Sequence, residues 1–326
     1  MKNVLFISTN FNSYYKEIIN KLNDFGFKVD WYSDRPSNGI IARALIRLNK
    51  KILKRKIKRY QEKIINETCT KKYDLILVIL GQSFNENFWL KLRKTQKTAS
   101  FIYYNWDSVN NFPCIRINAK YFDKVYSFDS EDCKNYGYLH LPLFYSDVFK
   151  KETIEEKYDF CFIGTVKPGR YLLIKNMISQ LEKNGLKGYI YFYLHSKFVL
   201  FYYKIKYRKE FKNVKSKEIS FKLLDKEECA LIESQSHIII DAAQPGQNGL
   251  TIRIFEALCL GKKIITTNQN IKKYDFYNPK NILLDSELSS ESIKTMKEEY
   301  HTVDKKIVQE YSIDSWVRKI IGDEMK

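Results

Sequence analysis

Arg253 and Glu256 lie three positions apart in a segment whose apolar residues recur at helical spacing. A guanidinium can bind phosphate oxygens through two parallel hydrogen bonds, and a carboxylate can accept hydrogen bonds from sugar hydroxyl groups. Near the start of a helix, this pair would suit a nucleotide, with Arg253 on the phosphates and Glu256 on the ribose or another sugar. The same spacing also fits an ion pair on a solvated helix face, so both interpretations stay open.

The residues just before this pair form a glycine-containing loop that should lead into a helix. The apolar run from Ile238 to Ile240 predicts a strand, Gly246 and Gly249 break the pattern, and the helix should begin near Leu250 or Thr251. The first N–H groups of a helix lack partners within it, and the helix dipole is positive at that end, which favours an anion. The residues expected to line this anion site are Asn248, Gly249, Leu250 and Thr251.

Asp107, in the sequence NWDSVN, is a candidate for acid–base chemistry. It follows a predicted strand from Ser100 to Tyr104 and should therefore lie at the carboxyl end of that strand. Burial can raise the pKa of a carboxyl group enough for it to hold a proton as a general base, and Trp106 could stack on a sugar ring. Asp107 could equally cap a short helix that begins near Ser108, or start a turn.

Short apolar runs alternate with helical patterns along the whole chain, which predicts parallel sheets covered by helices on both faces. The length of 326 residues suffices for two such domains. A charged stretch around residues 150–157 marks the expected boundary, which gives domains at 1–150 and 151–326. A last helical pattern lies at about 312–321.

Three strings resemble one family of enzymes. The segment GLTIRIFEALCLGKKIITTN, residues 249–268, resembles the donor-site segment of GT-B glycosyltransferases. The strings FDKVYSFDSEDCKNYGYLHLPLFY at 122–145 and YDFCFIGTVKPGR at 158–170 look more like the CgeB-type, spore-protein-like branch of that fold. The resemblance implies an α/β protein of two Rossmann-like domains with a cleft between them, the first binding an acceptor and the second a nucleotide sugar. In such enzymes a terminal helix often crosses back onto the N-terminal domain, and the pattern at about 312–321 could do so or pack on its own domain.

The resemblance also implies roles for individual residues of the second domain. The loop after the strand that ends at Gly164 and Thr165 would overlie the donor diphosphate, which makes Lys167 and Arg170 candidate phosphate ligands. His195, at the end of another predicted strand, could touch the donor or the transferred oxygen, or be a structural histidine. In retaining members a second glutamate commonly lies eight positions before the one matched by Glu256. Asn248 stands there, which weakens the case for a retaining mechanism.

The formal net charge of the chain is +18. Lysines are scattered along the whole chain, but two segments are especially rich in basic residues. The segments 41–65 and 197–217 combine many basic residues with apolar ones, and the second also carries several aromatic rings. Such segments could lie on an anionic membrane, bind RNA or single-stranded DNA, or expose basic faces to water alone. Because no RNA-binding motif is present, we expect the membrane surface and disfavour nucleic acid.

The remaining composition excludes several other classes. No apolar stretch is long enough to span a membrane, and the N-terminus does not resemble a signal peptide, so we expect a cytoplasmic protein at the inner face of the cell membrane. The six cysteines show no paired spacing for zinc or a disulfide framework. The acidic group Asp129, Glu131 and Asp132 lacks Asp-x-Asp spacing and should cap a helix instead. We therefore expect no metal and no cofactor.

Together these features predict a metal-independent glycosyltransferase. It would move a sugar from a nucleotide-activated donor to a hydroxyl of a glycan or lipid-linked glycan in the synthesis of capsule, lipopolysaccharide or exopolysaccharide. Catalysis would rest on holding donor and acceptor in line while cations stabilise the leaving diphosphate. The alternative is a non-catalytic basic protein of the same fold that associates with membrane or nucleic acid.

Overall fold

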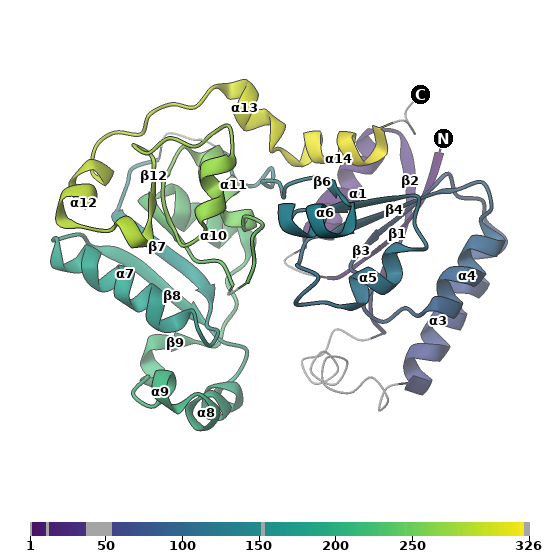
Figure 1. Ribbon diagram of the computed structural model, residues 1–326, viewed down its shortest axis with the longest axis horizontal. Coiled ribbons are helices and arrows are strands. Elements are labelled where there is room, and N and C mark those ends of the chain that lie inside the picture. The colour runs from purple at the N-terminus through teal and green to yellow at the C-terminus, as the bar shows by residue number, and fades with distance from the viewer. Residues whose placement is uncertain (1, 11–12, 37–53, 151–153, 245, 323–326) are drawn as a thin grey trace. The chain divides into compact units, whose positions relative to one another are not determined.

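The computed structural model describes residues 2–10, 13–36, 54–150, 154–244 and 246–322 (Figure 1). The chain divides into two compact units, here called unit 1 and unit 2. Unit 1 contains Met1–Pro142 together with Ile313–Lys326, and unit 2 contains Leu143–Ser312. The last helix, α14 (Ile313–Ile321), therefore belongs to unit 1 although it follows unit 2 in the sequence.

Unit 1 is built on a parallel sheet with the strand order β2-β1-β3-β4-β5-β6. The strands are β1 (Lys2–Ser8), β2 (Phe27–Ser33), β3 (Leu75–Ile79), β4 (Ser100–Asn105), β5 (Lys124–Ser127) and β6 (Leu139–His140). The helices besides α14 are α1 (Tyr14–Asp24), α3 (Lys54–Thr68), α4 (Glu86–Thr95), α5 (Cys114–Ala119) and α6 (Ser130–Tyr136). All five residues of β3 are buried, as expected for a central strand covered on both faces.

Helix α14 joins unit 1 through an apolar face. Its buried side chains Trp316, Val317, Ile320 and Ile321 recur at helical spacing. The indole of Trp316 packs edge-on against the ring of Tyr104, with ring centroids 4.8 Å apart. Lys21 of α1 forms an ion pair with Asp314 across a distance of 3.3 Å from Nζ to Oδ1.

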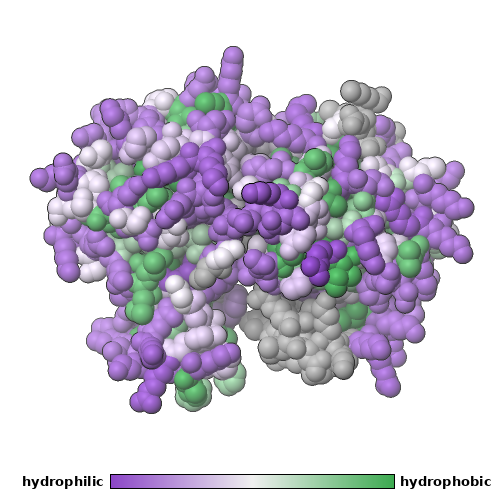
Figure 2. Space-filling model, in the orientation of Figure 1, coloured by the Kyte–Doolittle hydropathy of each residue, from purple (hydrophilic) through white to green (hydrophobic). Residues whose placement is uncertain are grey.

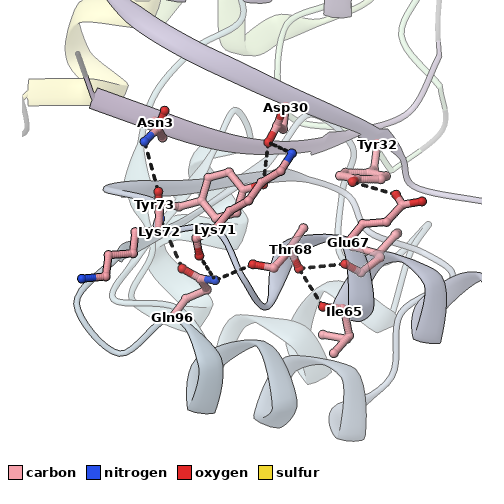
Figure 3. Close-up of polar contacts among 11 residues, drawn as sticks. Asn3, Asp30, Tyr32, Ile65, Glu67, Thr68, Lys71, Lys72, Tyr73 and Gln96 are labelled. Carbon is pink, nitrogen blue, oxygen red and sulfur yellow. Dashed lines mark hydrogen bonds and ion pairs between the residues drawn. The ribbon is translucent and has the colours of Figure 1, made fainter.

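Polar contacts at the amino ends of the strands fix α3 and α4 to the sheet of unit 1 (Figure 3). The side chain of Gln96 donates hydrogen bonds from Nε2 to the carbonyl oxygens of Thr68 and Lys71, over 3.0 and 2.9 Å. The Tyr73 hydroxyl and the Lys71 ammonium group both donate to Asp30 on β2. These contacts lie at the opposite edge of the sheet from the ligand-binding edge of a parallel α/β fold, and we assign them a structural role.

Unit 2 repeats the same architecture with the strand order β12-β11-β10-β7-β8-β9, again parallel throughout. The strands are β7 (Tyr158–Thr165), β8 (Gly188–Tyr193), β9 (Ile219–Ser220), β10 (Ser236–Asp241), β11 (Lys263–Thr266) and β12 (Ile282–Leu284). The helices are α7 (Tyr171–Lys183), α8 (Lys197–Lys206), α9 (Arg208–Phe211), α10 (Lys226–Ser234), α11 (Ile252–Leu260), α12 (Ser290–Met296) and α13 (Lys305–Glu310). The predicted α/β class with two Rossmann-like sheets is confirmed.

Several predicted elements differ in extent from the observed ones. Two patterns in the sequence, a helical one at 290–300 and a strand-like one at 138–143, predict longer elements than those observed. Helix α12 ends at Met296, and β6 contains only Leu139–His140. The basic segment 41–65 is helical from Lys54, while residues 41–53 lie outside the described residues. Within the parts of the chain that the structure describes, no helix combines the length and apolar character needed to cross a bilayer.

Candidate functional site

Asp241 organises the carboxyl edge of the sheet in unit 2. It is the last residue of β10 and is 1% exposed. Its Oδ1 accepts a hydrogen bond from the Thr251 hydroxyl over 2.8 Å, and its Oδ2 accepts one from the Thr266 hydroxyl over 3.2 Å. Sequence reasoning did not single out Asp241, although a carboxylate directly after the apolar run Ile238–Ile240 was the available signal.

The start of α11 lies beside Asp241 and, among the residues described, receives no cap from the side chain of its N-cap residue. Thr251 is the N-cap residue, but its hydroxyl is committed to Asp241 and makes no capping bond to the first turn. A threonine at this position usually accepts a hydrogen bond from one of the first N–H groups of the helix. The first turn of α11 therefore keeps the anion-binding character expected from the sequence.

Side-chain hydrogen bonds to its carbonyl groups fix the loop that leads into α11. The Asn268 side chain donates from Nδ2 to the carbonyl oxygens of Asn248 and Gly249, over 3.1 Å each. Asn270 Nδ2 also donates to the Asn248 carbonyl, over 3.2 Å. Leu250 is 1% exposed, so its side chain belongs to the core and only its backbone could meet a ligand. Pro245 of this loop lies outside the described residues.

Arg253 is paired with a residue that the sequence analysis missed. Its Nε donates to Oε1 of Glu233 on α10 over 3.1 Å, and the two side chains are 19% and 1% exposed. Burial disfavours the charged guanidinium, but the carboxylates of Glu233, Asp241 and Glu256 outweigh that effect and raise the pKa of Arg253. The expected alternative of a solvated Arg253–Glu256 pair is wrong, because Glu256 is only 4% exposed.

Arg170, at the N-cap position of α7, brings a second guanidinium to the same place. Burial lowers the pKa of Arg170, the positive charge of Arg253 lowers it further, and only Asp241 acts in the opposite direction. Among the described residues, the buried Nε of Arg170 has no hydrogen-bond partner. A buried donor without a partner is uncommon in folded proteins, and in a cluster of cations it is suited to an anionic ligand.

The loop between β7 and α7 carries the other predicted phosphate ligands. Gly164 and Thr165 end β7, and the partly buried Lys167 follows in the loop. Glu210 of α9 reaches this loop from outside the predicted site: its Oε2 accepts from the Gly169 N–H over 2.9 Å and its Oε1 from the Leu172 N–H over 3.4 Å. Glu210 thus caps the start of α7, a contact between residues 41 positions apart that the sequence did not reveal.

His195 is placed just beyond the end of β8. Its ring is exposed, and Nδ1 lies 3.0 Å from the Tyr193 hydroxyl, with the two rings packed edge to face. Because β7 pairs with β8 through Thr165 and Tyr193, His195 lies at the same edge of the sheet as the loop after β7. The contact with Tyr193 fits the structural interpretation, and a role toward a donor stays a prediction.

In unit 1, Asp107 lies in the loop after β4 and begins a turn. Its Oδ1 accepts from the Ser108 N–H and from Asn111 Nδ2, over 3.0 Å in each case. These contacts match the structural alternative for Asp107, and its role as a base stays a prediction. The expected capping by Asp129 is confirmed, because its Oδ1 accepts from the N–H groups of Glu131 and Asp132 in α6.

The carboxyl group of Asp132, on α6, has a raised pKa. It is 6% exposed, and its Oδ2 accepts from the Val109 N–H over 2.8 Å. Burial, together with the nearby carboxylates of Asp129, Asp107 and Glu131, raises the pKa of Asp132 to about 6 although the Val109 contact opposes the shift. This acidic cluster therefore holds a group that can exchange a proton near neutral pH, at the carboxyl ends of β4 and β5.

A cavity of about 410 Å³ lies between α3, α4 and the loop after β3. Its lining combines the apolar side chains of Ile57, Phe84 and Phe88 with lysines at positions 54, 58 and 91. Among the described residues, no group of His, Cys, Asp and Glu side chains is placed to hold a metal ion, and the six cysteines are free. Independence of a metal stays a prediction.

Comparison with solved structures supports the fold. The chain aligns with Anabaena Alr3699/HepE in complex with UDP and glucose (TM-score 0.61, 10% identity, 99% of each chain covered). It aligns with sucrose-phosphate synthase from Thermosynechococcus elongatus (TM-score 0.64, 11% identity, 98% of this chain and 97% of that one). It also aligns with the lipopolysaccharide outer core galactosyltransferase WaaB (TM-score 0.59, 11% identity, 99% of each chain). No protein-family model and no curated protein sequence matches the chain.

Proposed function

We propose that this chain is a glycosyltransferase that transfers a sugar from a nucleotide-activated donor bound by unit 2. The observation that carries the proposal is the buried Nε of Arg170 beside Arg253 and Asp241, which finds no hydrogen-bond partner within the residues that the structure describes. Two guanidinium groups at the carboxyl edge of a parallel sheet, next to an uncapped helix start, are complementary to a diphosphate. A bound diphosphate would supply the acceptor that Arg170 lacks.

In the proposed reaction, an acceptor hydroxyl oxygen bonds to the anomeric carbon of the donor sugar while the bond from that carbon to the phosphate oxygen breaks. The electron pair leaves with the nucleoside diphosphate, and the hydroxyl proton passes to a carboxylate of unit 1. Arg170, Arg253, Lys167 and the first N–H groups of α11 would stabilise the leaving diphosphate without a metal. Glu256 would accept hydrogen bonds from the ribose, with Gly164, Thr165, Asn248 and Gly249 forming the backbone of the site.

The acceptor is proposed to be a hydroxyl of a glycan or lipid-linked glycan in surface polysaccharide synthesis, bound by unit 1 at the inner face of the cell membrane. Supporting this assignment, unit 1 carries the acidic cluster of Asp107 and Asp132 and the lysine-edged cavity between α3 and α4. Lysines beside an apolar lining suit a molecule that joins an anionic group to a lipid chain. Asp107 would then be the proton acceptor, and the nearby carboxylate of Asp132 would interact with it electrostatically.

Calorimetric titration with UDP, UDP-glucose and the corresponding adenine and guanine nucleotides tests the donor site. Uridine nucleotides come first because HepE was solved with UDP and with UDP-glucose. We expect one nucleotide family to bind saturably, and Arg170→Gln to weaken that binding by at least about tenfold, since a charge-assisted contact is lost. The matched control is Arg318→Ala, an arginine of unit 1 that is 55% exposed and should leave the affinity unchanged.

Slow release of free sugar from the bound donor, followed in the absence of acceptor, then tests transfer. Nucleotide binding with no sugar release, even with glycan acceptors added, would favour a non-catalytic binding protein of the same fold. Absence of binding by every nucleotide would remove the proposal altogether.

A further inference from the structure

Helix α8 exposes four large apolar side chains along one face. Phe198, Phe201, Tyr202 and Ile205 are 77%, 61%, 45% and 64% exposed. Their spacing of i, i+3, i+4 and i+7 places them on one stripe of the helix, about 100° wide. Figure 2 shows a small hydrophobic area among hydrophilic residues at the lower edge of unit 2, where Figure 1 places α8. We call this group of four residues the α8 stripe.

The opposite face of α8 already holds the helix to unit 2. Leu200 is buried, and Val199, Tyr203 and Tyr207 pack against the core of that unit. The stripe is therefore not the face by which α8 packs on unit 2, because a separate face of the helix makes those contacts. Apolar groups of this size on a monomer surface commonly mark an interaction site.

Basic residues surround the stripe. On an ideal helix Lys206 lies on one side of it, and Lys197 and Lys204 on the other. The Lys206 ammonium group lies over the rings of Tyr202 and Tyr207, 5.5 and 5.4 Å from their centroids. The segment 197–217 contains eight basic residues (Lys197, Lys204, Lys206, Arg208, Lys209, Lys212, Lys215 and Lys217) and one acidic residue, Glu210.

We propose that the α8 stripe inserts into the interface of an anionic lipid bilayer, with the surrounding lysines at the headgroups. Aromatic rings and aliphatic chains on one helix face with flanking cations are the features of an interfacial helix. The proposal rests on the proposed function for its setting, a lipid-linked or surface glycan acceptor. Lipid binding is measured without donor or acceptor, so it succeeds or fails separately from transfer.

Size and charge distinguish this occupant from a protein partner. A stable protein interface buries about 800 Å² on each partner, more than one ten-residue helix face supplies. A second copy of the chain would also bring its own net charge of +18 toward these lysines. A bilayer needs only a few inserted side chains and carries the opposite charge.

Helix α3 provides an internal contrast. The basic residues at its start, Lys54, Arg55, Lys56, Lys58 and Arg59, are exposed, but its large apolar side chains Ile57 and Ile64 are buried. The described part of α3 therefore offers charge without an apolar stripe. It can be attracted to an anionic surface, whereas α8 has the side chains to enter one.

The test is co-sedimentation of the full chain with vesicles of phosphatidylcholine alone or of equal parts phosphatidylcholine and phosphatidylglycerol. The stripe variant is Phe198→Ser, Phe201→Ser and Ile205→Ser combined. Its matched control combines Leu90→Ser, Ile117→Ser and Leu231→Ser, which remove three apolar side chains that are 51%, 55% and 51% exposed elsewhere. Circular dichroism and thermal unfolding should match the parent for both variants, because every altered side chain is exposed.

We expect the parent and the control to bind the anionic vesicles equally, and the stripe variant to bind at least about tenfold more weakly. Lys204→Gln with Lys206→Gln should weaken binding to anionic vesicles by about fivefold per charge and leave the weaker binding to neutral vesicles unchanged. Equal vesicle binding by the stripe variant and the parent would overturn the proposal. Failure of the parent to bind anionic vesicles would also overturn it. In that case, RNA binding that the stripe variant loses would identify a nucleic-acid site, and dimers that the stripe variant loses would identify an interface between two copies of the chain.

Discussion

At the scale of single residues, the two arginines of unit 2 should respond in opposite ways to the loss of their charge. Arg170→Gln removes a guanidinium that is repelled by Arg253 and whose buried Nε has no partner in the described parts of the chain, so the free protein should be as stable as the parent or more stable. Arg253→Gln leaves the carboxylate of Glu233 buried without its cation and should cost about 3–5 kcal/mol. Thermal and urea unfolding without nucleotide measure both effects.

If Arg170→Gln proved strongly destabilising, Arg170 would be a structural residue and its place in a diphosphate site would need another basis. Arg59→Gln is a suitable reference for an ordinary arginine. Arg59 is exposed on α3, and substitution of such a surface residue usually changes stability by no more than about 0.5 kcal/mol.

Asp132 should make the stability of unit 1 depend on pH. Its pKa is raised from 3.8 in the unfolded chain to about 6 in the folded one, so the folded state binds more protons between these values. The contribution of Asp132 is therefore fully present below about pH 4 and is lost as pH rises through about 6. Asp132→Asn should be more stable than the parent at pH 8 and equal to it near pH 4, as measured by thermal unfolding at several pH values.

The sign of this difference is what tests the origin of the Asp132 shift. A variant that is less stable than the parent at pH 8 would mean that the negative charge stabilises the start of α6 more than burial and its acidic neighbours penalise it. Glu182→Gln, which alters an exposed carboxylate at the end of α7, is the control for the substitution itself.

At the scale of elements, Glu210 connects α9 to the loop between β7 and α7 in unit 2. Its carboxylate accepts from the N–H groups of Gly169 and Leu172, so Glu210→Ala should cost about 0.5–2 kcal/mol as a lost helix cap. Glu210 also fixes the loop that contains Lys167, so the affinity of the protein for nucleotide should fall in this variant. Binding of the protein to vesicles through the α8 stripe should stay unchanged. Calorimetry and vesicle co-sedimentation separate these two results, with Glu182→Ala on the same α7 as the control.

How far the sequence predicts these elements follows from the range of the contacts that form them. The strands β1, β3, β7 and β10 are recognisable because each contains an uninterrupted run of three or more apolar residues. The short α4 is not, since its three buried residues Phe88, Trp89 and Leu92 do not extend into a longer periodic pattern. The partners of charged side chains are also hard to predict when they lie far apart in the sequence.

The candidate site was predictable only in the part that is local in sequence. Three residues within five positions carry this part: Gly249 indicates the loop, Thr251 the helix start and Arg253 the cation. Glu233 lies 20 positions from Arg253, and Glu210 lies 41 positions from Gly169, so no spacing rule connects them. The sequence therefore predicted Arg253 as a ligand and missed the buried carboxylate that holds it.

At the scale of the whole molecule, the division into two units can be followed separately in solution. The four tryptophans, Trp31, Trp89, Trp106 and Trp316, all lie in unit 1, and unit 2 has none. Tryptophan fluorescence therefore reports the unfolding of unit 1 alone, whereas calorimetry reports both units. A nucleotide bound by unit 2 should raise a calorimetric transition and leave the fluorescence midpoint unchanged.

Helix α14 provides the corresponding perturbation of unit 1. Ile320 is 1% exposed, so Ile320→Ala should destabilise unit 1 by about 2–5 kcal/mol and lower the fluorescence midpoint. The transition that nucleotide raises should not move, because α14 belongs to unit 1 although it follows Ser312 in the chain. Arg318→Ala, on the exposed face of the same helix, is the control. A common shift of both transitions would instead mean that the two units unfold as one cooperative block, and that donor binding stabilises unit 1 as well.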